Sequence, residues 1–199
     1  GATSDVRLDS IIVYQNASTG VTDREGSAFA VTSDCDVTFR NCIAYSCRYG
    51  VWTAQGFSGT PTTKIDNCTL IASVYGIMRN DTETVTVRNT YCHGTTDAYS
   101  GTMTRTTCAH SSGTSFSGST ASVAHSTANF TNVTGGSQDY HLVSGSALLN
   151  VGTDLSGDFT GDIDEQTRPT GASTWDIGAD ELISGGGPFD GLRLFANGT

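Results

Sequence analysis

The chain has 199 residues and a net charge of −10, and only 15% of its residues are charged. Lys64 is its only lysine, so the clustered basic side chains that bind a phosphate backbone are missing and we expect no nucleic-acid partner. No apolar run is long enough to span a membrane, so we expect no membrane span. A chain with few charges that is rich in Ser, Thr and Gly is typical of β-solenoids and not of disordered proteins.

A first coil is predicted over residues 1–31, and a short motif then recurs along the chain. Residues 37–42, 63–68 and 85–90 read VTFRNC, TKIDNC and VTVRNT. Each is a short alternating strand that runs into Asn and then into a small residue. Weaker copies cover 103–108 and 121–126, so the Asn-equivalent positions 41, 67, 89, 107 and 125 are spaced by 26, 22, 18 and 18 residues. Strand-rich repeats of roughly 20–30 residues predict a solenoid.

Stacking the coils places equivalent residues about 4.8 Å apart along the solenoid axis. The spacing then predicts two inward columns and one ladder of amides at a turn, where small residues fit the crowded inside of the bend. Gly50, Gly76 and Ala98 mark a second small-residue position in each coil. The inward columns are Phe39, Ile65 and Val87, and Cys42, Cys68 and Cys108 with Thr90 in the gap; the turn ladder is Asn41, Asn67 and Asn89.

The repeat over about residues 5–130 resembles the right-handed parallel β-helix of pectate lyases, polygalacturonases and many phage tailspikes and fibres. The resemblance implies an all-β fold, a single-stranded right-handed parallel β-helix (solenoid), with its coils in 1–138. It implies no one function, because that fold carries enzymes, adhesins and structural parts.

The pattern changes from Asp139. The stretches DYHL, GSALLNVG, DIDEQTRP and DIGADE follow one another between 139 and 181. They resemble the C-terminal closing segment of large secreted or environmental β-helix proteins, with departures at Leu148, Asn150 and Glu165. The resemblance implies that 139–183 is a capping segment, because a solenoid end exposes a strand edge and an open core.

Arg168 is a lone arginine among the acids of this segment. We expect it to pair with Asp164, Asp176 or Asp180 and to pin the segment over the last coil.

Residues 184–199 form a glycine-hinged tail by composition, with three glycines before Pro188. Its apolar side chains predict docking on another subunit or a larger assembly, since such a tail is rarely left in water. A free, flexible end is the alternative. We therefore expect protein partners, either a homo-oligomer or a larger assembly. The docking residues are Phe189, Leu192, Leu194 and Phe195.

Six cysteines are enough for a disulfide framework. The repeat instead places three of them on one inner column, where they act as small buried hydrophobic residues. We expect reduced thiols, with a pair among Cys35, Cys47 and Cys92 as the alternative. Free thiols indicate folding in a reducing cytosol.

Polygalacturonases carry clustered acids around a Gly-His-Gly motif, and pectate lyases use an Arg or Lys base with an acidic calcium cluster; neither pattern is complete here, so we predict no catalytic residues. Arg40, Asp66 and Arg88 occupy equivalent coil positions and predict an outward Arg–Asp–Arg stack. With Trp52 they are the candidate glycan-binding face. A surface charge ladder is the simpler interpretation of the same stack.

Asp158, Asp162 and Asp164 lie in a Gly-containing loop and are the candidate metal ligands. Hard cations take several carboxylate and carbonyl oxygens, so calcium is the ion that this loop would bind. The loop has no EF-hand spacing, and the four histidines show no ligand spacing. We expect no cofactor, with calcium as the alternative.

The missing catalytic motifs, the expected free thiols and the hinged tail favour a non-enzymatic structural or attachment module. A bacteriophage virion component fits best: a capsid decoration protein, a head fibre or a tail-associated protein, found on a virion or an extracellular surface. The alternative is a carbohydrate-active module with a surface glycan as its partner, either a polysaccharide lyase, a glycoside hydrolase or a glycan-binding domain.

Overall fold

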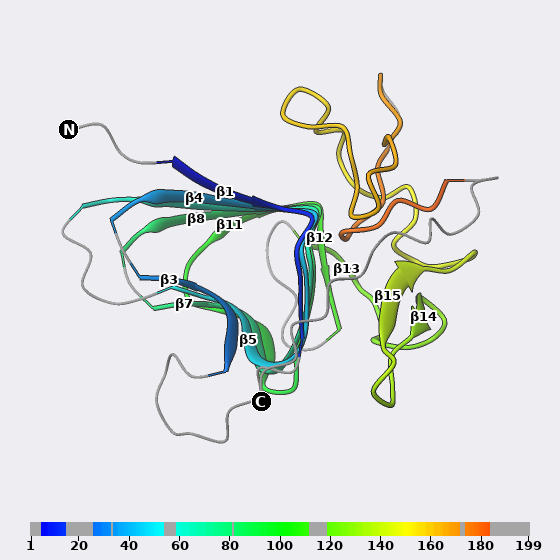
Figure 1. Cartoon of the computed structure of the whole chain (residues 1–199), viewed down its shortest axis with the longest axis horizontal. Helices are drawn as coiled ribbons and strands as arrows, with labels where there is room; N and C mark the ends of the chain where they lie inside the picture. Colours follow the sequence, from blue (N-terminus) through cyan, green and yellow to red (C-terminus); the bar gives the residue numbers. More distant parts are fainter. Residues whose placement is uncertain are drawn as a thin grey trace.

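The computed structural model describes residues 5–14, 26–32, 34–53, 59–80, 82–111, 119–171 and 174–183. All the regular elements in these ranges are β-strands (Figure 1). A search of the same ranges for a helix long and apolar enough to cross a bilayer found none. The strands are β1 (Asp5–Asp9), β2 (Ile12–Tyr14), β3 (Ser27–Val31), β4 (Asp36–Arg40), β5 (Ile43–Thr53), β6 (Thr62–Asp66), β7 (Thr69–Arg79), β8 (Thr84–Arg88), β9 (Tyr91–Gly94), β10 (Asp97–Ser100), β11 (Thr104–Thr106), β12 (Cys108–His110), β13 (Ser119–Ser122), β14 (Phe130–Asn132) and β15 (Asp139–Leu142).

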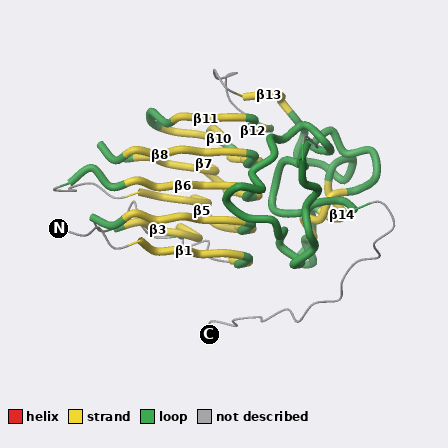
Figure 2. The backbone as a smooth tube through the Cα atoms, turned by 90° about the horizontal axis from the view of Figure 1, so that it is seen from above, coloured by secondary structure: helices red, strands yellow, loops and turns green. Residues whose placement is uncertain are grey.

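The strands build a parallel β-solenoid of about four turns, which confirms the predicted fold class. One parallel sheet has the order β1-β4-β6-β8-β11. The other has the order β2-β5-β7-β9-β12-β13, with β3 paired to β5 and β10 paired to β7. Seen from above, the strands of successive coils lie one over the next (Figure 2).

The strand register places the repeated motif in columns. Phe39 pairs with Ile65 and Ile65 with Val87, and all three side chains are buried. Leu8 precedes them in the first coil. In the last pair Arg105 faces Val87, and its guanidinium lies 5.1 Å from the centroid of the buried Tyr99 ring. A charged side chain therefore covers the apolar column at its β11 end.

Each coil turns from one sheet into the other through a residue in the left-handed backbone region. Asn41, Asn67 and Asn89 have φ of 50°, 46° and 47°, and Ser10 and Thr107 have φ of 53° and 50° at the equivalent positions. Asn tolerates this conformation better than other residues that carry a side chain. The amides also connect the coils, because Asn89 Nδ2 donates to Asn67 Oδ1 at 3.2 Å.

The residue after each bend points into the stack. Cys42, Cys68 and Cys108 are fully buried, and all six cysteines are free. Thr90 fills the gap in this column: its hydroxyl donates to Arg88 O at 2.9 Å and accepts from Cys68 N at 3.3 Å. The hydroxyl is thus satisfied inside an otherwise apolar column.

Gly50 and Gly76 are required because neighbouring coils approach closely at these positions. A Cβ on Gly50 would lie 2.4 Å from Gly76 O, and one on Gly76 would lie 2.8 Å from both Ala98 O and Cys92 Cβ. These contacts are with backbone or with the base of a buried side chain, so a larger residue could not be accommodated by a rotamer change.

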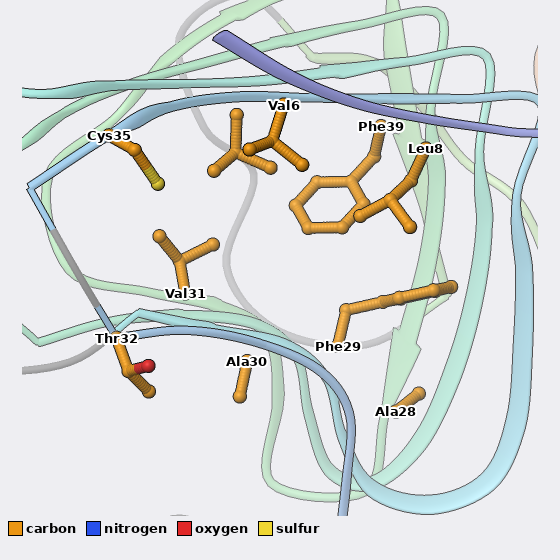
Figure 3. Close-up of a pocket in the computed structure, with 10 residues that line it drawn as sticks. Val6, Leu8, Ala28, Phe29, Ala30, Val31, Thr32, Cys35 and Phe39 are labelled. Atoms are coloured by element: carbon orange, nitrogen blue, oxygen red, sulfur yellow. The ribbon is translucent and has the colours of Figure 1, made fainter. Parts of the chain in front are cut away.

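The N-terminal end of the stack is hollowed (Figure 3). The depression has a volume of about 350 Å³ and is lined by side chains of β1, β3 and β4, among them Leu8, Phe29, Val31 and Phe39. Among the residues that the structure describes at this end, no charged side chain lies over the inner columns as Arg105 does at the other end.

Residues 139–171 and 174–183 lie along the side of the stack, at the bends that carry the Asn ladder (Figures 1 and 2). Apolar side chains on the outer face of the second sheet, among them Ile43, Ile71 and Tyr91, pack against apolar side chains of this closing segment. The segment contacts successive coils and does not lie only over the last coil, where the sequence predicts it. The sequence does not reveal this second core, because Ile43 and Ile71 lie in continuous apolar runs that hide which residues face outward. The closing-segment side chains in this core are Tyr140, Leu142, Leu148, Ile163, Ile177 and Ala179.

Candidate functional site

Three of the four residues predicted for the glycan face lie together. The register pairs Arg40 of β4 with Asp66 of β6, and Asp66 with Arg88 of β8. Arg88 binds the Asp66 carboxylate with two hydrogen bonds, Nε to Oδ1 at 2.8 Å and Nη2 to Oδ2 at 2.7 Å. Bidentate arginine–carboxylate pairs of this kind are among the stronger charge-assisted hydrogen bonds in proteins. The predicted Arg–Asp–Arg stack is therefore an ordered ladder across three coils.

The closing segment covers this ladder. Asp158 Oδ2 accepts from Arg88 Nη2 at 2.8 Å, and Asp158 O accepts from Arg40 Nη1 at 3.2 Å. The Arg40 guanidinium also lies 5.0 Å from the centroid of the Phe159 ring. Asp66 is 0% exposed. The Arg88 guanidinium lowers the pKa of Asp158, so the pair is ionised at neutral pH. The ladder thus binds the chain's own closing segment.

Trp52 does not lie with the other three. It sits near the end of β5, 3% exposed, in a cluster with Tyr49, Tyr75 and Met78. The rings of Tyr49 and Tyr75 in this cluster are stacked with centroids 6.1 Å apart. Since Trp52 and Arg40 belong to different sheets, the structure does not bring together the aromatic ring and the charges that a shared glycan groove would need.

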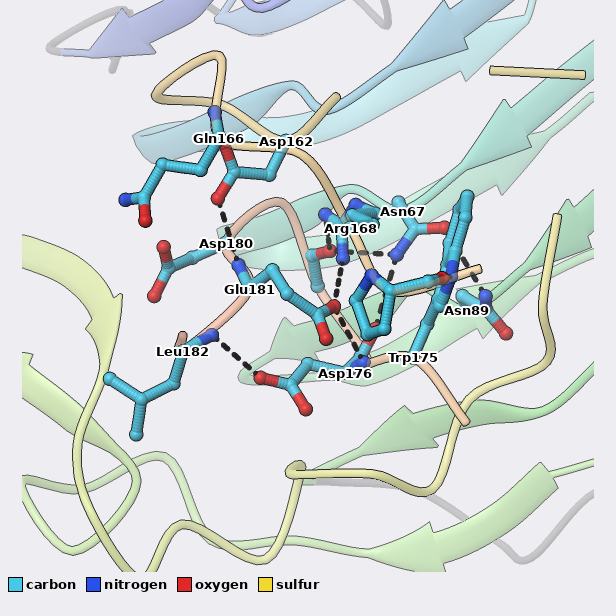
Figure 4. A network of polar contacts seen from close by, with 12 residues as sticks. Asn67, Asn89, Asp162, Gln166, Arg168, Trp175, Asp176, Asp180, Glu181 and Leu182 are labelled. Atoms are coloured by element: carbon cyan, nitrogen blue, oxygen red, sulfur yellow. Dashed lines mark hydrogen bonds and ion pairs between the residues drawn. The ribbon is translucent and has the colours of Figure 1, made fainter. Parts of the chain in front are cut away.

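Arg168 is the centre of a buried polar network in the closing segment (Figure 4). It is 1% exposed, and its Nη1 donates to Glu181 Oε2 at 2.7 Å. Its Nη2 donates to the carbonyls of Gly178 and Ala179 at 3.2 and 2.8 Å, and its guanidinium lies 5.2 Å from the centroid of the Trp175 ring. The charge is therefore paired, and each of the three guanidinium nitrogens donates at least one hydrogen bond to the protein.

The acidic partner of Arg168 differs from the three that we expected. The ion pair is with Glu181, whose pKa burial raises to about 7. Asp176 accepts instead from the backbone N–H groups of Asn150 and Leu182, at 2.7 and 2.8 Å. Asp180 points away from the guanidinium (Figure 4). Asp176 and Asp180 are engaged by backbone N–H groups and Asp164 by His141, and the sequence pattern does not reveal these bonds.

The closing segment makes a separate contact with each rung of the Asn ladder. Asn41 Nδ2 donates to Gly161 O at 3.0 Å, and Asn67 Nδ2 donates to Asp176 O at 3.1 Å and to Gly178 O at 3.2 Å. Asn89 Nδ2 donates to Thr153 O at 2.7 Å. The ladder that turns the coils thus also holds the segment against three of them.

The three candidate calcium ligands have different partners in the structure. Asp158 pairs with Arg88, as described above. Asp162 Oδ1 accepts from the backbone N–H groups of Asp164 and Gln166, at 2.9 and 2.8 Å, and its Oδ2 accepts from Glu181 N at 3.2 Å. Asp164 faces a histidine. Asp162 therefore acts as an anchor for the backbone of the loop.

That histidine is His141, and it belongs to a cluster of ionisable groups that the sequence analysis does not predict. Its Nε2 lies 2.8 Å from Asp164 Oδ2, and its Nδ1 contacts Asp139. These two carboxylates raise the pKa of His141 to about 10. Asp180 is nearby, with its pKa raised to about 6 by burial. Only the Asp139–His141 spacing was visible in the sequence, since residues two apart on a strand share a face.

A pair of imidazoles lies on the outer face of the second sheet. The rings of His93 and His125 have centroids 4.4 Å apart, and His93 Nδ1 contacts the Ser111 hydroxyl. Burial lowers the pKa of His93, and burial together with the neighbouring His93 lowers that of His125 to about 4. Both rings are therefore neutral at pH 7.

The predicted docking residues Phe189, Leu192, Leu194 and Phe195 lie outside the described residues, so the docking of the tail stays a prediction. A scan of the sequence against protein-family models found no match, and a search of the curated proteins found no matching relative.

Proposed function

We propose that this protein is a non-enzymatic structural or attachment module, and that it serves as a component of a bacteriophage virion, such as a capsid decoration, head-fibre or tail-associated protein. The observation that carries the proposal is the covered ladder of Arg40, Asp66 and Arg88. This cluster of charges on the outer face of the coils binds the closing segment through Asp158. The charges thus serve to hold the fold together.

Two further features support the same function. The closing segment is tied to three successive coils through buried amides, which suits a protein that must stay folded outside the cell. The free cysteines of the inner column suit assembly in a reducing cytosol before release. Within this proposal the chain belongs to the β-helix proteins that its repeats and closing motifs resemble.

The carbohydrate-active alternative needs different geometry. Hydrolysis of a glycosidic bond uses two carboxyl groups that flank the bond. Asp66 is fully buried and paired with Arg88, so it cannot supply one of them without opening the closing segment. Trp52 is buried in another cluster. These contacts favour the structural function over the enzymatic one.

The test is whether the native protein belongs to a particle. We would fractionate source material on a density gradient and locate the chain with an antibody. We expect it to migrate with particles that contain nucleic acid, and purified protein to release no reducing or unsaturated sugar ends from acidic or neutral polysaccharides. Exclusively free protein together with sugar release would overturn the proposal.

The partner in this proposal is a second subunit or another virion protein, contacted through residues 188–199. Phe189, Leu192, Leu194 and Phe195 could each bury a side chain worth roughly 1.5–3 kcal/mol before ordering costs. Deleting 186–199 should leave the coils folded, measured by circular dichroism, but abolish self-association in light scattering or incorporation into particles. A truncated chain that assembles like the full one would remove the tail from the proposal.

A further inference from the structure

Metal-ligating side chains converge where three parts of the closing segment meet. His141 is on β15, Asp164 lies in the turn closed by the Gly161–Thr167 bridge, and Asp180 lies near the end of the segment. One ligand atom from each of the three side chains lies within 4.8 Å of the other two. An imidazole nitrogen and two carboxylate oxygens are thus already close together.

Asp139 fixes the orientation of the imidazole. Its Oδ1 contacts His141 Nδ1 and also accepts from the backbone N–H of His141 at 3.1 Å. With Nδ1 held, Nε2 on the other side of the ring is directed at Asp164, 2.8 Å away. Histidines that ligate metal ions commonly donate their second ring N–H to a carboxylate in this way, which sets the tautomer and the ring plane.

The charges of the cluster also favour a cation. Three carboxylates, Asp139, Asp164 and Asp180, surround one imidazole that carries at most a single positive charge. Asp180 is only 4% exposed. Its Oδ2 accepts from Leu142 N at 2.6 Å, which directs the carboxylate toward β15. A divalent ion would balance the negative charge that three carboxylates leave beside one imidazolium.

We propose that His141 Nε2, Asp164 and Asp180 bind a divalent transition-metal ion, best matched by zinc, with Asp139 as the positioning residue. The imidazole nitrogen argues against calcium and magnesium, which take oxygen ligands. At zinc–ligand bonds of about 2.0–2.1 Å, tetrahedral geometry places ligand atoms roughly 3.3 Å apart, so the three donors need only small movements.

Zinc binding has a defined proton balance. The ion replaces the proton shared between His141 Nε2 and Asp164, that proton passes to solvent, and the imidazole ligates as a neutral base. The His141 and Asp164 side chains are 25% and 18% exposed, so water can reach the fourth position. The bound ion would tie β15, the turn at Asp164 and the end of the segment together.

The test uses the full chain, freed of metal with EDTA and titrated with ZnCl₂ in a calorimeter. We expect one zinc ion per chain, and a melting temperature that rises with zinc but not with the same concentration of CaCl₂ or MgCl₂. Cobalt(II) should give a visible spectrum of nitrogen and oxygen ligation without thiolate charge-transfer bands, which separates this site from the cysteines.

Variants assign the ligands. H141Q and D164N should each abolish the zinc-dependent rise in melting temperature, while D139N should keep one site per chain but weaken its affinity roughly 10–100-fold. H93Q is the matched control, because it alters a half-buried histidine outside the proposed site, in the His93–His125 pair. D164N changes a loop side chain, so it serves if H141Q does not fold. Absence of zinc binding by the wild type, binding unchanged in D164N, or binding lost in H93Q would overturn the proposal.

Discussion

Arg168 Nη2 donates to the side-chain oxygen of Asn41 at 3.3 Å, across 127 residues of sequence. Asn41 sits at the bend of an early coil with φ of 50°, and Arg168 lies in the closing segment. A turn residue and a buried cation thus stabilise each other. The closing segment is positioned by the ladder, and each ladder amide makes part of its hydrogen bonds to the segment.

Replacing Arg168 by alanine should destabilise the protein by about 3–5 kcal/mol. Glu181 would then be left as a buried carboxyl group without its cation, and breaking a buried pair on one side carries a cost of this size. Urea unfolding would measure the loss, and limited proteolysis should show faster cleavage within 139–183. R7A, which removes an exposed arginine of β1, is the control and should change stability little. Equal stability of R168A and R7A would contradict the role given to Arg168.

Substitutions of Asn67 should separate its backbone role from its side-chain role. N67A loses the hydrogen bonds to Asp176 O and Gly178 O. It also places a Cβ at φ of 46° without a side-chain amide to stabilise that conformation by local hydrogen bonding. N67G loses the same bonds but tolerates that φ. We expect N67G to cost about 1–3 kcal/mol and N67A roughly 1–2 kcal/mol more, measured by chemical unfolding. If the two variants are equally stable, the left-handed bend is not what selects Asn.

Thiol titration of the native protein should find one rapidly reacting cysteine. Cys35 is partly exposed and the other five are buried. Burial also raises the pKa of Cys47 to about 12 and that of Cys108 to about 11, which keeps both as unreactive thiols. Titration with a chromogenic disulfide should give one fast equivalent, and five more after denaturation. C35S should remove the fast phase, and fast reaction of Cys42, Cys68 or Cys108 would contradict the stacked column.

Acid should destabilise the pair formed by His93 and His125. Besides His93, the rings of Phe130 and Tyr140 face His125. The pKa of His125 falls from 6.5 to about 4 in the fold. Its contribution is therefore fully present above about pH 6.5 and is lost as the pH falls toward 4. Carboxylates titrate in the same range, so the measurement is the difference in melting temperature between wild type and H125N. The difference should shrink between pH 7 and pH 4, and a constant difference would mean that His125 does not titrate there.

The sequence by itself determined the solenoid and the register of its coils. Parallel stacking repeats each position at a fixed rise, so a motif that recurs with the same order of apolar and small residues must form columns. The pairs Phe39–Ile65 and Ile65–Val87, and the bends at Asn41, Asn67 and Asn89, follow from that local rule. The contacts that set these pairs and bends are made within one coil or between adjacent coils.

Only the tertiary structure decided what lies against the outside of the coils. The closing segment runs along the Asn ladder, its Asp158 covers Arg88, and its Arg168 pairs with Glu181. It also brings His141 to Asp164 and Asp180. These contacts join residues far apart in the sequence, with no repeat to set their spacing. Which carboxylate pairs with Arg168 or with His141 is set by burial and by competition among several nearby carboxylates. Both depend on how the whole segment packs.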